Sequence, residues 1–294
     1  MSGEKSGFIL VLAAAFAFAA KTVLVKMAFL YGVDAITALT LRMSFAGLIF
    51  GGILVYNVYR KTWSLKLSGR QWLAVVLLGF CGYYLSSFLD FSGLVYIDAS
   101  LGRMILFLYP TLVVLMNARL KRQPVKSTTW LAIGLCYGGI FLMLLPNLGG
   151  EQKNVWLGSS LVFGAAFCYS FYLIGVERML KSINPTFFTS LALCVSCLCV
   201  LGHFFLTHPA EDLWSAPAPA VFLGFLMGAF STVFAVYAMT AGIARIGASR
   251  AALISMIGPV LTFLLGAVLL DERLTLVQIA GMFVIILGVS RVGK

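Results

Sequence analysis

The chain has 294 residues, of which 61% are hydrophobic and only 11% are charged, and its mean hydropathy is +1.02. A soluble domain carries about 25% charged residues, so this composition excludes a water-soluble globular protein and predicts an all-α integral membrane protein. The 21 lysine and arginine residues exceed the 10 acidic residues, which gives a net charge of +11. No basic patch interleaved with aromatic residues lies outside the apolar segments, so nucleic acid is not an expected partner.

The apolar stretches divide into ten segments of roughly 20 residues, the length that crosses a bilayer as a helix. The first is longer than the core of a signal peptide, about 7–15 residues, so we expect it to be a retained span. The expected spans are residues 7–30, 35–56, 71–92, 98–118, 127–146, 155–177, 185–206, 218–241, 248–270 and 274–291.

All six cysteines fall inside these spans. The group Cys194, Cys197 and Cys199 has the spacing of a metal or redox site, but no histidine or carboxylate lies near it in the same apolar segment. Small buried thiols are the better interpretation. The sequence therefore predicts no metal site, no disulfide scaffold and no cofactor.

Basic residues gather in every second connection between spans, and the positive-inside rule places those connections in the cytoplasm. On this side lie Lys5, Arg60, Lys61, Lys66, Arg70, Arg119, Lys121, Arg122, Lys126, Arg178, Lys181, Arg245, Arg250, Arg291 and Lys294. The opposite connections carry Lys153, Arg273 and the acidic residues Glu151, Glu211, Asp212, Asp271 and Glu272. We expect a multi-pass protein of a bacterial cytoplasmic (inner) membrane with both termini in the cytoplasm.

Residues 98–112 (DASLGRMILFLYPTL) and 247–261 (GASRAALISMIGPVL) repeat one pattern: Ala-Ser, an apolar run, then Pro and Leu. Subtracting Ser100 from Ser249, or Pro110 from Pro259, gives 149 in both cases. Each proline removes a helical hydrogen bond near mid-span, and such a defect is tolerated in a membrane only against protein or a watery cavity. Two matching broken spans in matching halves indicate the binding site of a transporter.

The same offset of 149 extends over most of each half, pairing Gly79 with Gly228 and Gly139 with Gly288. Because each half has five spans, the second half enters the membrane upside down. We therefore expect two inverted five-helix repeats around a central cavity, residues 1–145 and 155–294, joined by a linker at 146–154 in a single transport domain. Glycine-rich faces in the fifth and tenth spans predict close packing, either within the chain or in a homodimer.

With these features the chain resembles the drug/metabolite transporter superfamily, EamA type. The matching residues are Arg42 in the Thr-Leu-Arg of the second span, the Ala-Ser…Pro spans, and the segment from Leu269 to Gly281 (LLDERLTLVQIAG). The resemblance implies export of amino acids or related metabolites through a cavity walled by spans one, three, four, six, eight and nine. An aromatic amino-acid exporter of the YddG kind is the nearest expectation, although no motif fixes the substrate. One departure is Leu120–Pro124 (LKRQP), where many members carry a glutamate.

Ionisable residues inside spans are costly and are candidate functional groups. Lys21 lies slightly past the middle of the first span, where it receives a substrate carboxylate, pairs with Asp90 or extends its ammonium to the membrane interface. Arg103 either binds an anion directly or pairs with Asp90 or Asp98 to gate the outer mouth. Arg42 lies in a span that is peripheral in the family, so we assign it a structural role.

Polar residues at helical spacing complete the expected site. Tyr83, Ser87 and Asp90 share one face of the third span. Ser170, beside Tyr169, is the repeat partner of Lys21, so the two would flank one carboxylate across the pseudo-axis. Ser255 would supply the opposite wall, and Pro110 and Pro259 would serve as hinges. For the tyrosines, helix packing with a satisfied hydroxyl is an equally good interpretation.

These residues favour a secondary exporter of amino acids or other small carboxylate-bearing metabolites that works by alternating access across the lipid bilayer. Two alternatives stay within transport: efflux of drugs or lipophilic cations, which calls for a buried carboxylate where Lys21 stands, and exchange of phosphorylated metabolites, which calls for more clustered basic residues. An integral-membrane enzyme or lipid-handling scaffold is a third class. No nucleotide-binding or hydrolase motif supports it.

Overall fold

The computed structural model describes residues 2–63, 66–97, 99–147, 154–269 and 274–292, and all regular structure within these ranges is helical. The first half contains α1 (Ser2–Phe29), α2 (Ala35–Tyr59), α3 (Gly69–Gly79), η1 (Phe80–Leu85), α4 (Ser86–Leu94), α5 (Ala99–Leu106), α6 (Tyr109–Lys121), α7 (Ser127–Leu144) and η2 (Leu145–Asn147). The second half contains α8 (Val155–Met179), α9 (Pro185–Thr207), α10 (Glu211–Trp214), α11 (Ala218–Gly228), η3 (Ala229–Phe234), α12 (Ala235–Ile246), α13 (Ala248–Ile254), η4 (Ser255–Ile257), α14 (Gly258–Leu269) and α15 (Leu276–Ser290).

Nine helical stretches in the described ranges are long and apolar enough to cross a membrane. The tenth expected span corresponds to α15, which has 15 residues. The starts of several helices follow local capping chemistry: Asp34 accepts a hydrogen bond from the Thr37 amide, and Ser68 and Thr275 form capping boxes with the glutamines three residues on. The predicted fold class of membrane helices is therefore confirmed.

Four spans are interrupted, and the interruptions repeat with the offset of the sequence. The π-helical turns η1 and η3 begin at Phe80 and Ala229 and end at Leu85 and Phe234, and both pairs differ by 149. The break between α5 and α6 falls at Phe107 and Leu108, and the 3-10 turn η4 falls at the equivalent place before Pro259. The proline breaks were expected. The two π-helical turns contain no proline and were not.

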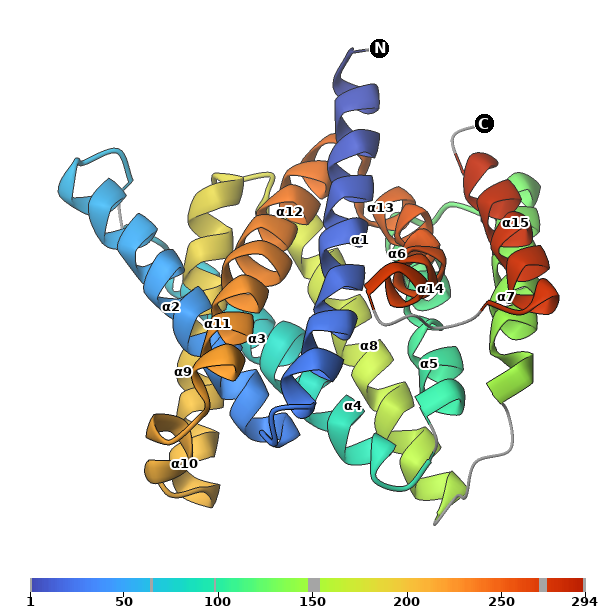
Figure 1. The fold of residues 1–294 in the computed structure, drawn as a ribbon. Helices are drawn as coiled ribbons and strands as arrows, with labels where there is room; N and C mark the ends of the chain where they lie inside the picture. The colour runs from blue at the N-terminus through green and yellow to red at the C-terminus, as the bar shows by residue number, and fades with distance from the viewer. Residues whose placement is uncertain (1, 64–65, 98, 148–153, 270–273, 293–294) are drawn as a thin grey trace.

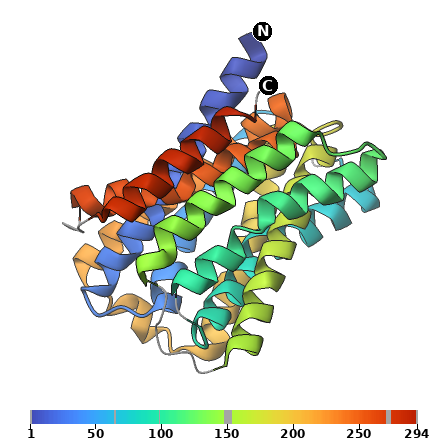
Figure 2. The ribbon, with the colours of Figure 1, turned by 90° about the vertical axis from the view of Figure 1, so that its right-hand side faces the viewer.

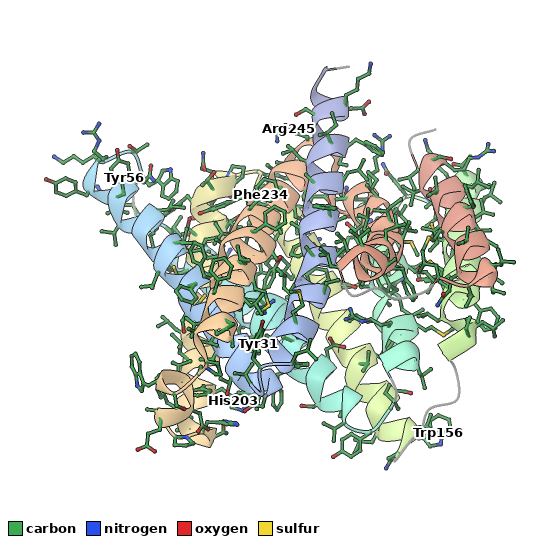
Figure 3. All side chains as sticks on the ribbon, viewed as in Figure 1. Tyr31, Tyr56, Trp156, His203, Phe234 and Arg245 are labelled. Carbon is green, nitrogen blue, oxygen red and sulfur yellow. The ribbon has the colours of Figure 1, made fainter. Side chains whose placement is uncertain are left out.

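The halves are inverted with respect to each other. In Figure 1, α1 starts on the side of the molecule where both chain ends lie, whereas its repeat partner α8 ends on that side. We call this side, which carries the ends of α2, α6, α8 and α12, the basic face. Figure 3 shows Arg245 at the basic face and Trp156 and His203 at the opposite end. The lysine- and arginine-rich connections thus lie together at one end of the molecule.

Helices pack against their repeat partners: α2 lies against α9, and α7 lies alongside α15, as Figure 2 shows. Gly79 sits against the Ala192 carbonyl on α9, and Gly228 sits against the Arg42 carbonyl on α2, at equivalent positions of the two repeats. Small residues allow this approach of backbones in lipid.

The glycines of the fifth and tenth spans serve mainly in packing between α7 and α15 of the same chain. Gly139 and Gly281 face each other between α7 and α15, and a Cβ on either would lie 2.6 Å from the carbonyl oxygen of the other. Gly134 and Gly138 lie on the outward face of α7, where an added Cβ would meet no described atom within 4 Å. A homodimer stays a prediction for that outward face alone.

Candidate functional site

A cavity of about 180 Å³ lies between the two repeats. The resemblance implies walls from spans one, three, four, six, eight and nine, and all six contribute lining residues. The second span, α2, contributes as well. The elements that carry lining residues are α1, α2, η1, α4, α5, α6, α8, α12, η4 and α14. The side chains and glycines that line it are Ala15, Phe18, Ala19, Lys21, Arg42, Gly82, Tyr83, Ser86, Ser87, Asp90, Arg103, Leu106, Phe107, Tyr109, Ala165, Tyr169, Met239, Ser255, Gly258 and Thr262.

Three of the four helix interruptions open onto this cavity. Tyr83 lies in η1, Ser255 in η4, and Phe107 at the break between α5 and α6. The carbonyl of Phe107, near the Pro110 break, accepts a hydrogen bond from the Tyr137 hydroxyl at 3.1 Å. Pro110 and Pro259 are both buried in the protein. The broken backbone is therefore placed against protein and cavity, as hydrocarbon requires.

Three cations and one carboxylate line the cavity: Lys21, Arg42, Arg103 and Asp90. No hydrogen bond or ion pair within 4.0 Å joins any of these four groups to a partner in the described part of the chain. The nearest aromatic contact of the Lys21 ammonium is the Phe18 ring, whose centroid is 6.0 Å away. The expected ion pair of Asp90 with Arg103 or Lys21 is thus not formed, and Asp98 lies outside the described residues.

The expectation that Arg42 lies at the periphery is wrong, while its assignment to a structural role stays a prediction. Its side chain is 6% exposed, lines the cavity, and leaves Nε without a hydrogen-bond partner among the described residues. The signal that would have found it is the one that selected Lys21: an ionisable residue within an apolar span. Ser86, Tyr109 and Thr262 also line the cavity and were not anticipated.

A group of tyrosines lines part of the cavity. The ring of Tyr169 lies edge-on to those of Tyr83 and Tyr109, with centroids 6.3 and 5.1 Å away. Tyr172 packs behind them, 5.3 Å from Tyr83, and does not itself line the cavity. Edge-to-face packing of this kind fixes ring orientation, so three hydroxyl-bearing rings are held in place against the cavity.

Ser170 does not have the predicted contact with the cavity. It is fully buried, and its hydroxyl donates to the carbonyl oxygens of Tyr109 at 3.1 Å and Ala166 at 2.7 Å. The hydroxyl therefore ties α8 to the start of α6, beside the Pro110 break. Of the expected binding residues the structure brings together Lys21, Tyr83, Ser87, Arg103, Tyr169 and Ser255, with Asp90 among them.

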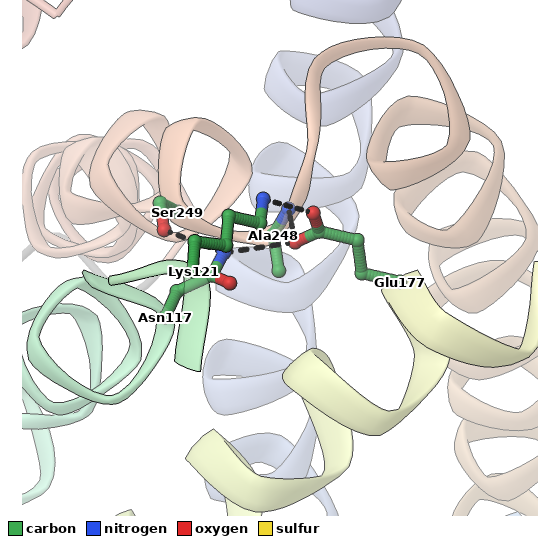
Figure 4. Close-up of polar contacts among 5 residues, drawn as sticks. All are labelled: Asn117, Lys121, Glu177, Ala248 and Ser249. Carbon is green, nitrogen blue, oxygen red and sulfur yellow. Dashed lines mark hydrogen bonds and ion pairs between the residues drawn. The ribbon is translucent and has the colours of Figure 1, made fainter. Parts of the chain in front are cut away.

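A polar network around Glu177 joins three helices at the basic face (Figure 4). The Glu177 carboxylate accepts hydrogen bonds from the Lys121 ammonium at 2.6 Å, the Asn117 amide at 3.0 Å and the Ala248 backbone amide at 2.9 Å. Asn117 also donates to the Ser249 hydroxyl at 3.0 Å. Because Asn117 and Lys121 belong to the first repeat and Glu177, Ala248 and Ser249 to the second, this Glu177 network fastens the repeats together at that end.

Known proteins place this architecture among transporters. The chain is 26% identical to an uncharacterized transporter of Synechocystis sp., over 97% of this chain and 92% of that protein. It is 28% identical to the uncharacterized transporter YcbK of Bacillus subtilis, over 97% of this chain and 93% of that protein. It is also 28% identical to an S-adenosylmethionine/S-adenosylhomocysteine transporter of Chlamydia muridarum, over 60% of this chain and 55% of that protein.

A crystal structure of a protein with 18% sequence identity shares the fold, with a TM-score of 0.82 and coverage of 98% of this chain and 96% of the other. The matches give no support to the narrower expectation of a YddG-type exporter, which stays a prediction. The model of the EamA-like transporter family matches residues 5–145 and again residues 156–292. The chain is therefore a multi-pass membrane protein that belongs to the EamA-like transporter family, a secondary transporter and not an enzyme.

Proposed function

We propose that this protein exports amino acids or related small carboxylate-bearing metabolites across the cytoplasmic membrane of a bacterium. The observation that carries the proposal is the unpaired group Lys21, Arg42 and Arg103, among the described residues, in a cavity between two inverted repeats. Buried charges are costly unless they are paired, so a bound carboxylate would compensate these cations. Asp90, in the same wall, would receive the ammonium of an amino acid.

The size of the cavity favours small cargo. Its volume of about 180 Å³ is below the roughly 300–1,000 Å³ of sites for drug-sized ligands. Efflux of lipophilic cations is disfavoured further, because a cation would enter a wall with three positive groups and one negative group. The name of the Chlamydia relative gives S-adenosylmethionine and S-adenosylhomocysteine as its substrates, which carry an amino-acid carboxylate but are larger than the cargo that this cavity favours.

Alternating access follows from the ends of the cavity. Asp90 lies in the middle of α4 and Arg103 in the last turn of α5, and these two helices are the parts of spans three and four between the helix breaks and the end of the molecule opposite the basic face. The Glu177 network fastens the repeats at the basic face. Opening toward the basic face would require this network to separate while the interrupted spans bend at Pro110 and Pro259. The positive-inside rule assigns the basic face, with both termini, to the cytoplasm.

The proposal is tested with the purified chain in proteoliposomes. Radiolabelled phenylalanine and threonine should move down their gradients without ATP, and Lys21→Ala should abolish the flux. Lys181→Ala is the matched control, because Lys181 is exposed in the connection between α8 and α9, outside the cavity. Flux of a quaternary ammonium compound without any amino-acid flux would favour cation efflux instead.

A further inference from the structure

The formal charges of the described residues that face the cavity do not balance. Lys21, Arg42 and Arg103 contribute three positive charges and Asp90 contributes one negative charge, so the described part of the lining carries an excess of two positive charges. A zwitterionic amino acid brings no net charge and would leave this excess unchanged. In a buried site of low dielectric, uncompensated charge is costly. The cargo that fits best is therefore one whose negative charge matches the positive excess.

All four charged groups belong to the first repeat. The residues 149 positions further on are Ser170, Leu191 and Ala252 for the three cations, and Met239 for Asp90, and all of these are uncharged. The residues that the described part of the second repeat contributes to the cavity are all neutral: Ala165, Tyr169, Met239, Ser255, Gly258 and Thr262. A cargo would therefore place its anionic groups toward the first repeat and its uncharged part toward the second.

The backbone that carries Arg42 is held tightly in place. A Cβ on Gly228 would lie 2.8 Å from the Arg42 carbonyl oxygen, and one on Gly224 would lie 2.8 Å from Cβ of the preceding Leu41. Because α11 packs directly on this turn of α2, the guanidinium cannot leave the cavity by a shift of its helix. The guanidinium carried on this backbone offers planar, bidentate binding to a carboxylate or a phosphate.

We infer that the preferred cargo is a dianion, either a dicarboxylate or a phosphomonoester, and that Arg42 binds one of its anionic groups. This inference rests on the proposed transport function and narrows the substrate class of the same cavity. Lys21 and Arg103 bind the remaining anionic oxygens, while the tyrosine hydroxyls and Ser255 contact the uncharged part.

The test uses three compounds of one carbon skeleton whose charge changes in single steps: succinate, succinamate and succinamide. Binding to the full chain in lipid nanodiscs is measured by the rise in unfolding temperature and by competition with labelled succinate. Succinate should bind at least about tenfold more tightly than succinamate, and succinamide should not bind. Glycerol 3-phosphate compared with succinate shows whether a phosphomonoester or a dicarboxylate is the better ligand, and glycerol serves as the uncharged control.

Variants then test Arg42. Arg42→Gln should weaken the binding of the dianion by about tenfold or more and remove the preference over succinamate, whereas Arg42→Lys should keep part of that preference. Arg178→Gln, which changes a cation outside the cavity, should keep all of it. The comparison of the three compounds on the unaltered protein stands even where an Arg42 variant fails to fold.

Equal affinity for succinate and succinamate, or an unchanged preference in Arg42→Gln, would overturn the inference. If phenylalanine and threonine are carried while no dianion binds, the proposed function stands and the inference fails. If neither amino acids nor dianions bind or cross the membrane, both fail.

Discussion

The ammonium of Lys121 at the end of α6 lies 2.6 Å from Oε1 of Glu177 near the end of α8, and this ion pair links the two repeats. The two partners are unequal, since the Lys121 side chain is 48% exposed and that of Glu177 is 16% exposed. An exposed ion pair contributes little, about 0–1 kcal/mol, because solvent screens it. Glu177 also accepts hydrogen bonds from Asn117 and the Ala248 amide, so it is the centre of the Glu177 network.

Glu177→Ala should therefore destabilise the protein more than Lys121→Ala does. Removing the carboxylate leaves the Asn117 amide and the Ala248 backbone amide without this acceptor, which costs about 1–3 kcal/mol, whereas removing the ammonium costs less than about 1 kcal/mol. The unfolding temperatures of the two variants in detergent show which of them is less stable. Lys181→Ala serves as the control for loss of a surface cation. A larger effect for Lys121→Ala would show that the ion pair, and not the hydrogen-bonded network, holds this end together.

Adjacent glycines on α7 provide a matched pair of substitutions. A Cβ on Gly139 would lie 2.6 Å from the Gly281 carbonyl oxygen and 2.9 Å from the Ile285 amide, whereas one on Gly138 would meet nothing described within 4 Å. Gly139→Ala should separate α7 from α15 and destabilise by about 1–3 kcal/mol. Gly138→Ala should be neutral, or stabilising by up to about 1 kcal/mol, through its higher helix propensity. Unfolding temperatures of the two variants decide the point; equal values would mean that α7 and α15 are packed more loosely than the structure has them.

Hydropathy predicts the spans of this chain well because about 20 consecutive apolar residues have few alternatives to a membrane helix. The offset of 149 likewise predicts the inverted repeats. The same symmetry gives a wrong prediction at Ser170. As the repeat partner of Lys21, Ser170 is expected to line the cavity, but its hydroxyl donates a hydrogen bond to the Tyr109 carbonyl instead. The resemblance places the helix of Arg42 at the periphery, whereas in the structure α2 packs on Gly224 and Gly228 of α11 and the Arg42 side chain lines the cavity. The π-helical turns have no marker residue comparable to the prolines.

The two serines of the expected site should separate stability from transport. Ser170→Ala removes a buried hydroxyl that bonds to Tyr109 and Ala166, so it should lower the free energy of unfolding by about 1 kcal/mol and leave the substrate concentration at half-maximal flux unchanged. Ser87→Ala alters a cavity-lining residue, so it should change that concentration and leave stability within about 0.5 kcal/mol. The two measurements are unfolding in detergent and initial flux into proteoliposomes. The reverse assignment of effects would return Ser170 to the binding site.

Gly82 should be required for the placement of the tyrosine group that lines the cavity. A Cβ at Gly82 in η1 would lie 2.5 Å from Cγ of Tyr172, which packs behind Tyr83 and Tyr169. Gly82→Ala therefore displaces the Tyr172 ring, and because the rings pack against one another, Tyr83 and Tyr169 move with it.

We expect Gly82→Ala to lower flux at least about tenfold, because misplacing groups in a site by about 1 Å can cost about a hundredfold. Gly52→Ala is the control, since a Cβ at Gly52 in α2 meets nothing described within 4 Å and should leave flux unchanged. A second variant, in which the Tyr172 side chain is also shortened, tests whether the clash with that ring is the cause. Gly82→Ala combined with Tyr172→Ala removes the ring atoms that the new methyl group would meet and leaves only Cβ, 3.0 Å away, so it should recover part of the flux. No recovery would mean that Gly82 is needed for its own contact with the cargo and not for the placement of the tyrosines.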